Sequence, residues 1–358
     1  MQTALLRTAP VLLAMACAPG ETTLGTDRGT DPSTDTAAEP GLGPIDGWQV
    51  ADFGDDGSDQ LVVATPDGMR ALGIAVDGDR VLVEERASVR LRPSDWEVGH
   101  LLPWGTGLFV MNARGSRMVA YDADLDQQWE GTFGEDLPAG SMLAGRLDTD
   151  ADDDLTIVSS DATTLLRMRN DGIDGWQVHA DFVGDFGGFD WVDAGPLLGG
   201  PREDMVVVGP QLLVTSARDD DFAHAPDAVL ADAPHLDAVV AQLEVDGPPH
   251  LVAATVSGVT AYRGDPTQPA LFRVDGMIGL ERVRQLVRIP GGDQDTIGVV
   301  HAGGFTRLRG PSLDPDGDAP LGPDVEVIHF RDQGASWLLW IDLATGQLGA
   351  VPALDPPT

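Results

Sequence analysis

The sequence predicts an all-β protein whose body is a single β-propeller of about seven four-stranded blades. Short apolar strands recur along the chain, and their first apolar residues are Leu61, Leu108, Leu155, Met205, Leu251, Ile297 and Leu338. The intervals between these positions are 47, 47, 50, 46, 46 and 41 residues. Such a repeat is typical of propeller blades, because one blade is too thin to bury both of its faces alone. Because the C-terminal part of the repeat is less regular, six to eight blades are allowed.

The first unit shows the strand pattern most clearly. Apolar strands are expected at 48–53, 61–64, 69–76 and 81–84, with an acidic loop after the first strand and tight turns after the next two. No segment of the unit has the 3.6-residue period of an amphipathic helix. Four short strands in one unit of this length favour a propeller blade over a helical repeat.

Two positions recur at fixed distances from the first apolar residue of each unit's main strand. Eight residues before it stands an apolar side chain, expected to be buried, in six units: Phe53, Leu147, Leu197, Leu243, Ile289 and Phe330. The second unit has His100 at this position. Seven residues after it stands a glycine in four units: Gly68, Gly115, Gly258 and Gly304. We expect positive φ at these glycines, because a tight hairpin turn between short strands needs that conformation.

The C-terminal part of the repeat is less regular. Residues 310–323 include the acidic stretch 314–318, DPDGD, and are expected to form a loop outside the repeat. Only a short Pro-rich tail follows residue 351, so the last blade is expected to lack its outer strand. The predicted propeller covers residues 45–354, and residues 355–358 are a tail.

The N-terminal segment predicts export and lipidation. Residues 1–17, MQTALLRTAPVLLAMAC, contain one basic residue, a short apolar stretch and small residues before Cys17, the only cysteine of the chain. The apolar stretch is far shorter than the ~20 residues of a membrane-spanning helix, but it suits a signal peptide. Residues 13–17, LAMAC, resemble a bacterial lipobox, in which the cysteine becomes the lipidated first residue of the mature protein. Ala14 departs from the Leu that is usual at its position.

The lipobox resemblance implies a lipoprotein of the cell envelope. Ala18 follows the cysteine where retention at the inner membrane would favour Asp, so an outer-membrane anchor is expected. An ordinary secreted protein with an incidental cysteine is the alternative. Residues 18–44 are dominated by Thr, Asp, Gly and Pro and should form a flexible tether, with a reach of roughly 30 Å.

The net charge excludes several classes of partner. The chain has 58 acidic residues against 22 basic ones, and its formal net charge is −36. Such a field repels phosphate backbones and anionic lipids, so no nucleic acid is expected and the membrane is reached only through the N-terminal lipid. An unidentified protein or a neutral glycan remains as the partner.

Two acidic loops resemble a known repeat family. Residues 51–63, ADFGDDGSDQLVV, look like an FG-GAP or VCBS-type repeat, and residues 146–155, RLDTDADDDL, are a second, degenerate match. This family builds integrin-α-like propellers, and its loops often hold calcium between alternating acidic residues.

The family resemblance implies a structural Ca²⁺ ion in these loops. Calcium takes six to eight oxygen ligands. The candidate ligands are Asp52, Asp56 and Asp59 in the first loop and Asp148, Asp150, Asp152 and Asp154 in the second. Gly54, Gln60 and Arg146 depart from the family pattern. Because Asp and Gly also form ordinary turns, a loop without metal is the alternative.

No catalytic constellation is recognised, so no catalytic residue is assigned. The seven histidines show no metal-ligand spacing, and no GxSxG, Walker-type or GxGxxG motif stands in a strand–turn–helix context. The leading hypothesis is a noncatalytic binding or interaction module of the cell envelope. The alternatives are a propeller enzyme, either glycan-active or quinoprotein-like, and an envelope-assembly scaffold. The segments 121–124, YDAD, and 340–348, WIDLATGQL, show a weaker likeness to PQQ-type propellers.

Overall fold

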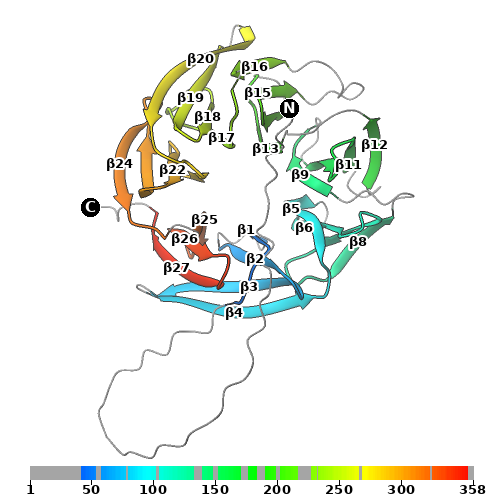
Figure 1. Ribbon diagram of the computed structural model, residues 1–358. Helices are drawn as coiled ribbons and strands as arrows, with labels where there is room; N and C mark the ends of the chain where they lie inside the picture. Colours follow the sequence, from blue (N-terminus) through cyan, green and yellow to red (C-terminus); the bar gives the residue numbers. More distant parts are fainter. Residues whose placement is uncertain are drawn as a thin grey trace, which may run out of the picture.

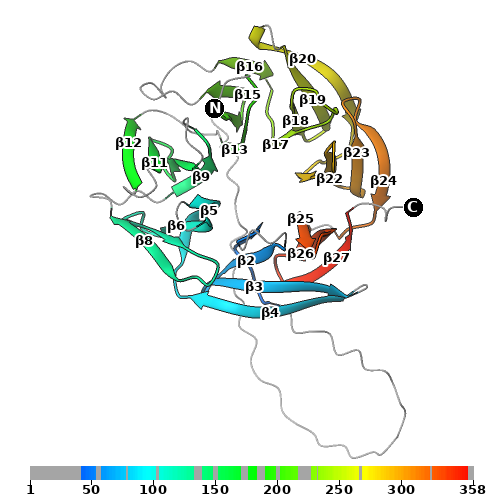
Figure 2. The same ribbon diagram turned by 180° about the vertical axis from the view of Figure 1, so that it is seen from behind.

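Seven antiparallel sheets follow one another around a central axis in the computed structural model, as Figures 1 and 2 show from opposite sides. The structure describes residues 42–53, 58–77, 80–101, 105–132, 139–147, 152–170, 176–183, 190–198, 202–216, 227–231, 233–265, 268–322 and 325–353. Within these ranges all regular elements are β-strands, and no helix is long and apolar enough to cross a membrane. The predicted all-β propeller is therefore confirmed, with seven blades.

Six of the seven sheets have four strands in the described part of the chain. The first three blades are β1 (Gly47–Ala51), β2 (Gln60–Thr65), β3 (Gly68–Asp77), β4 (Arg80–Val89); β5 (Pro93–Leu101), β6 (Gly105–Asn112), β7 (Arg117–Tyr121), β8 (Gln127–Thr132); and β9 (Ala139–Gly145), β10 (Asp154–Ser159), β11 (Thr164–Asn170), β12 (Trp176–Val183). The next two are β13 (Asp190–Gly195), β14 (Asp204–Val208), β15 (Leu212–Ser216), β16 (Ala228–Ala231); and β17 (Asp237–Ala241), β18 (His250–Thr255), β19 (Gly258–Asp265), β20 (Gln268–Gly279). The last two are β21 (Gln285–Ile289), β22 (Thr296–His301), β23 (Gly304–Arg309), β24 (Asp314–Ala319); and β25 (Val325–Asp332), β26 (Ala335–Asp342), β27 (Gln347–Pro352).

Each blade runs from the centre of the ring outward in chain order (Figure 1). The innermost strands are β1, β5, β9, β13, β17, β21 and β25, and the contacts of β25 with β1 and of β27 with β4 close the ring. The seventh blade has three strands in the described residues, as the short tail predicted.

One prediction about the strands is wrong. Residues 314–319 were expected in a loop, but they form β24, the outer strand of the sixth blade. An outer strand pairs on one side only, so Pro315 does not interrupt a ladder on both sides. Gly317 takes a φ of 134°, and the Arg307 guanidinium donates to the Asp316 carbonyl at 3.0 Å. The polar composition reflects exposure at the rim.

The hydrophobic core is divided among the blade interfaces. Seven clusters of buried side chains occur in the described residues, and each one joins two neighbouring blades. Strand β2 sends Val62 and Ala64 toward the second blade and Leu61 and Val63 toward the seventh. All four are at most 1% exposed. A strand covered on both faces needs a continuous apolar run, which explains the repeating strand pattern in the sequence.

The recurring positions have the expected roles, with one exception. The apolar residues eight positions before each main strand's first apolar residue are all buried: Phe53, Leu147, Leu197, Leu243, Ile289 and Phe330. Positive φ is confirmed at Gly68 (142°), Gly115 (72°) and Gly304 (126°), but it does not occur at Gly258. There a Cβ would lie 2.4 Å from the carbonyl oxygen of Ile278, so close approach of the backbone requires the glycine.

The chain meets the propeller slightly before the predicted start at residue 45. The N–H of Leu42 donates to the carbonyl of Gly346 at 3.2 Å, and the N–H of Ile45 donates to that of Leu343 at 3.0 Å. Residues 42–44, predicted as the end of the tether, therefore lie against the seventh blade. The rest of the predicted tether, the predicted signal peptide and the predicted tail at 355–358 lie outside the described residues.

Candidate functional site

Polar side chains on the inner strands link neighbouring blades around the ring. An acidic or amide side chain on one inner strand bonds to the backbone of the next. These links are Asp193 to the N–H of Val240 at 2.6 Å, Asp237 to the N–H of Leu286 at 2.8 Å, and Gln285 to the N–H and carbonyl of Val327 at 3.0 and 2.9 Å. They fix the positions of the inner strands relative to one another.

Two of these inner strands carry carboxyl groups with raised pKa values. Burial raises the pKa of Glu97 on β5 from 4.5 to about 8, and the negative charge of Asp95 adds to the effect. Burial likewise raises the pKa of Asp193 on β13 to about 6, although two backbone N–H groups donate to it. Glu97 and Asp193 interact electrostatically although they belong to the second and fourth blades. The charge of Asp193 therefore adds to the raised pKa of Glu97.

The raised pKa of Glu97 has a chemical consequence. At neutral pH Glu97 is largely a neutral carboxylic acid, which can donate a hydrogen bond as well as accept one. Carboxyl groups with such shifts occur often at functional sites. Sequence reasoning missed this pair because the two residues lie in different units and have no shared motif.

A second set of acidic residues joins the blades near the ends of the inner strands. Each stands two residues before the first apolar residue of its blade's main strand. Its carboxylate accepts the N–H of a residue in the preceding blade, and its own N–H donates to the carbonyl of that residue. The pairs, with these two distances, are Asp59–Arg331 (2.7 and 2.8 Å), Asp153–His100 (2.6 and 3.4 Å), Glu203–Arg146 (3.1 and 3.0 Å) and Asp295–Gln242 (2.8 and 2.7 Å).

The structure brings together two of the three calcium candidates of the first loop. The carboxylates of Asp52 and Asp59 lie 3.5 and 3.1 Å from the guanidinium of Arg331, which comes from the seventh blade. Asp59 and Asp332 also line a cleft of about 240 Å³. Asp56 lies outside the described residues.

In the second loop, Asp152 and Asp154 are buried. Asp154 accepts the N–H of Asn170 at 3.0 Å and lies 3.9 Å from the buried guanidinium of Arg167. Asp148 and Asp150 lie outside the described residues, as does Cys17. Calcium binding and lipidation therefore stay predictions, although some of the candidate oxygens already have arginine or backbone partners.

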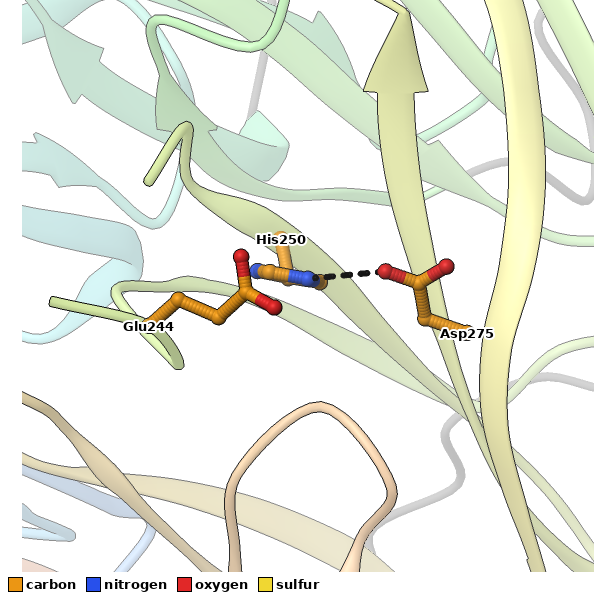
Figure 3. A group of neighbouring side chains, drawn as sticks. All are labelled: Glu244, His250 and Asp275. Atoms are coloured by element: carbon orange, nitrogen blue, oxygen red, sulfur yellow. Dashed lines mark hydrogen bonds and ion pairs between the residues drawn. The ribbon is translucent and has the colours of Figure 1, made fainter. Parts of the chain in front are cut away.

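A third group was not found from the sequence. Among the residues that the structure describes, Glu244, His250 and Asp275 in the fifth blade form the one group of potential metal ligands, with ligand atoms within 4.8 Å of one another. Figure 3 shows the imidazole of His250 between the two carboxylates. Imidazole and carboxylate are both ligands of zinc-like divalent metals.

These features define the class of protein as a seven-bladed β-propeller whose inner strands are joined by polar side chains. The sequence matches no protein-family model and no curated protein. Solved structures with the same fold include BBS1N in complex with ARL6DN, in a crystal soaked with lead, with a TM-score of 0.59 and 13% identity over 86% of this chain and 93% of that one. The mercury-soaked crystal of that complex gives 0.58 and 14% over 86% and 92%. The Cps50 (Swd1) β-propeller domain of Myceliophteria thermophila gives 0.54 and 10% over 87% and 98%.

Proposed function

We propose that this chain is a noncatalytic interaction module, displayed at the cell envelope by a lipid on Cys17, that binds a protein partner through the rim of the propeller. The observation that carries the proposal is the surface of β20. This outer strand exposes Val274 and Met277, which lie on the same face, by 53% and 70%. Apolar side chains gathered on an exposed strand edge are typical of a binding surface.

The register of β20 shows which side of the strand is uncovered. A bulge at Asp275 places Val274 and Met277 on the same face as Tyr262, toward the fourth blade. The neighbouring outer strand, β16, has only four residues against the twelve of β20. Most of β20 therefore extends beyond this neighbour, as the long strand in Figure 1 illustrates.

Two further observations support an interaction role. One of the similar propellers, BBS1N, was solved in complex with ARL6DN. The net charge of −36 favours a partner with basic groups around its apolar contact, because complementary charge speeds association.

The partner proposal is tested by capture from the native envelope under matched substitutions. The wild-type chain, a Val274→Asp/Met277→Asp variant and a Leu82→Asp/Val83→Asp control on β4 are immobilised and exposed to a detergent extract. Leu82 and Val83 are also exposed, so the control adds the same charge at another rim position. We expect one captured protein to be lost only with the β20 variant. The same captured proteins from all three chains would contradict the proposed surface, and the identity of the partner distinguishes an adhesion role from an envelope-assembly scaffold.

The proposed lipid anchor rests on the lipobox-like segment and the tether that follows it. Cys17→Ser should move the protein from the membrane fraction to the soluble fraction and abolish incorporation of labelled fatty acid. Retention of the Cys17→Ser variant in the membrane fraction would contradict the anchor.

The proposed structural calcium rests on the FG-GAP-like loops. Addition of a chelator should lower the Tm if calcium binds the folded state preferentially. An unchanged Tm would remove calcium from the proposal without affecting the interaction module.

The enzyme alternative has one specific observation in its favour, namely the raised pKa values of Glu97 and Asp193. A carboxylic acid with a raised pKa and a second carboxylate are the groups that glycoside hydrolysis requires. Hydrolysis of a glycan panel by the wild type, with loss of activity in both Glu97→Gln and Asp193→Asn, would favour the enzyme. If the wild type hydrolyses no more glycan than a variant that carries both substitutions, the noncatalytic module is favoured.

A further inference from the structure

The Glu244–His250–Asp275 group, the blade-five cluster, is assembled from three separate parts of the fifth blade. Glu244 lies in the connection between β17 and β18, His250 is the first residue of β18, and Asp275 is the bulged residue of β20. The bulge matters because an extra residue changes the direction of the side chains that follow it on the strand. The three ligand atoms converge to within 4.8 Å although the residues are up to 31 positions apart.

His250 is the buried member of the cluster. Its side chain is 0% exposed, and its Nε2 atom lies 3.4 Å from a carboxylate oxygen of Asp275. In the described part of the chain its Nδ1 atom has no hydrogen-bond partner. A buried polar atom without a partner costs about 1–3 kcal/mol. The imidazole is therefore only partly satisfied by the protein itself.

In the third and fourth blades the residue at the equivalent position is bonded to the backbone instead. The residue before the first apolar residue of the main strand is also buried in the third and fourth blades, where it is Asp154 and Asp204. Each of these carboxylates accepts a backbone N–H, that of Asn170 at 3.0 Å and that of Leu198 at 2.7 Å. No backbone hydrogen bond to the His250 ring occurs among the described residues, so a role in securing the blade does not account for this imidazole.

The loop that carries Glu244 is held in place. The side-chain amide of Gln242 donates to the carbonyl oxygens of Glu244 and Gly247, the latter at 2.8 Å. A Cβ at Gly247 would lie 3.0 Å from Glu244 Oε2, so the glycine lets the loop pass close to the carboxylate. The backbone of the loop that carries Glu244 is thus fixed.

Two arginines pair with the carboxylates of the cluster. Arg263, which pairs with His250 across β18 and β19, lies 2.9 Å from Glu244 Oε2 and 3.7 Å from Asp275 Oδ2. Arg273 lies 3.4 Å from Asp275 but is 70% exposed. The Arg263 side chain is 25% exposed and can turn toward solvent. It is the cation that the two carboxylates share.

We propose that Glu244, His250 and Asp275 bind a divalent transition metal of the Zn²⁺ type, which displaces Arg263. One imidazole nitrogen and two carboxylate oxygens suit zinc, whereas a calcium site is built from oxygen ligands alone. Zinc bonds of 2.0–2.2 Å place tetrahedral ligand atoms about 3.4 Å apart. Rotation of the partly exposed Glu244 and Asp275 side chains achieves this contraction. The fourth position is left to water or to an atom of a bound partner.

The test is a Zn²⁺ titration of the full chain carrying Cys17→Ser, which removes the only thiol. After removal of metal with a chelator, isothermal titration calorimetry should show one ion bound per chain. His250→Gln should weaken binding at least tenfold, whereas the control His301→Gln in the sixth blade should not change it. Because His250 is buried, Glu244→Gln provides a second variant at a partly exposed site, and it should also weaken binding.

Arg263→Gln distinguishes a metal site from an ion-pair network. In the metal site it removes the competing cation, so Zn²⁺ should bind several-fold more tightly. Substitution of Zn²⁺ by Co²⁺ should give absorption bands in the wild type that change with His250→Gln. No stoichiometric binding, equal affinities of His250→Gln and His301→Gln, or weaker binding by Arg263→Gln would overturn the proposal.

Discussion

Removal of the Asp59 carboxylate tests how the first and last blades are joined. The side chain of Asp59 accepts the backbone N–H of Arg331 at 2.7 Å and lies 3.1 Å from its guanidinium. Asp59→Ala removes both interactions, but the hydrogen bond from the Asp59 N–H to the Arg331 carbonyl stays. The substitution therefore weakens the closure of the ring without removing backbone pairing.

The expected loss follows from the exposure of the two partners. A hydrogen bond to a charged group contributes about 1.5–3 kcal/mol, and Asp59 is only 8% exposed. The Arg331 side chain is 47% exposed, so solvent screening reduces its ion pair to less than about 1 kcal/mol. We expect a loss of about 2 kcal/mol in the free energy of unfolding. In a large domain this equals a fall of roughly 4 °C in Tm.

Thermal unfolding followed by circular dichroism measures this effect. Glu84→Ala is the matched control, because it removes one negative charge from an exposed position on β4. Its Tm should stay within about 1 °C of the wild type. If Asp59→Ala and Glu84→Ala have the same Tm, the Asp59–Arg331 bridge does not contribute to ring closure.

Three further predictions concern buried charge and backbone conformation. The folded-state pKa of Glu97 is raised from 4.5 to about 8, so the native state holds an extra proton and loses stability as pH rises through this window. Glu97→Gln should therefore reduce the fall in Tm between pH 5 and pH 8. A pH profile of Tm that does not change with the substitution would refute the raised pKa of Glu97. Arg167→Ala removes the guanidinium that lies beside the buried Asp154 carboxylate, and it should lower the free energy of unfolding in urea by about 3–5 kcal/mol. A loss below about 1 kcal/mol would show that the pair is not strongly coupled. At Gly68, with a φ of 142°, a Cβ would lie 2.2 Å from a backbone oxygen, so Gly68→Ala should lower the free energy of unfolding by more than about 1 kcal/mol. The control Gly292→Ala, where a Cβ meets open space, should change it little. Equal losses in the two variants would contradict the turn geometry.

The propeller could be predicted from the sequence because its core is repetitive. Strands buried on both faces need continuous apolar runs, so positions such as Leu61 and Leu155 recur at blade intervals. The turn glycines follow from backbone sterics alone, which is why positive φ at Gly68 could be predicted. Gly258 shows the limit of this argument, since its role depends on a carbonyl from a neighbouring strand. The outer strand β24 was missed because an edge strand needs little apolar burial and tolerates Pro and Asp.

The candidate sites were less accessible from the sequence. Glu97 and Asp193 interact only because the ring arranges their two blades around one axis, and Asp275 reaches His250 only because a bulge redirects it. An acidic residue two positions before the main strand's first apolar residue was visible in four units. At Asp59 this pattern was interpreted as part of a calcium loop, although it also marks a blade junction. The sequence could not distinguish these uses because both require a carboxylate at the end of a strand.

A circular permutation tests most directly whether the blades form a closed ring. The wild-type body enters near Leu42, beside Gly346, and its last described residue, Ala353, follows the six-residue strand β27. A strand of this length spans about 20 Å, so a Gly/Ser linker of roughly a dozen residues can join the two ends. New termini in the connection between β24 and β25 then place the seventh blade first. A closed ring predicts a soluble β-sheet protein that unfolds in one cooperative transition within about 5 °C of the wild type. A permuted chain with no cooperative transition would contradict the closed seven-bladed ring.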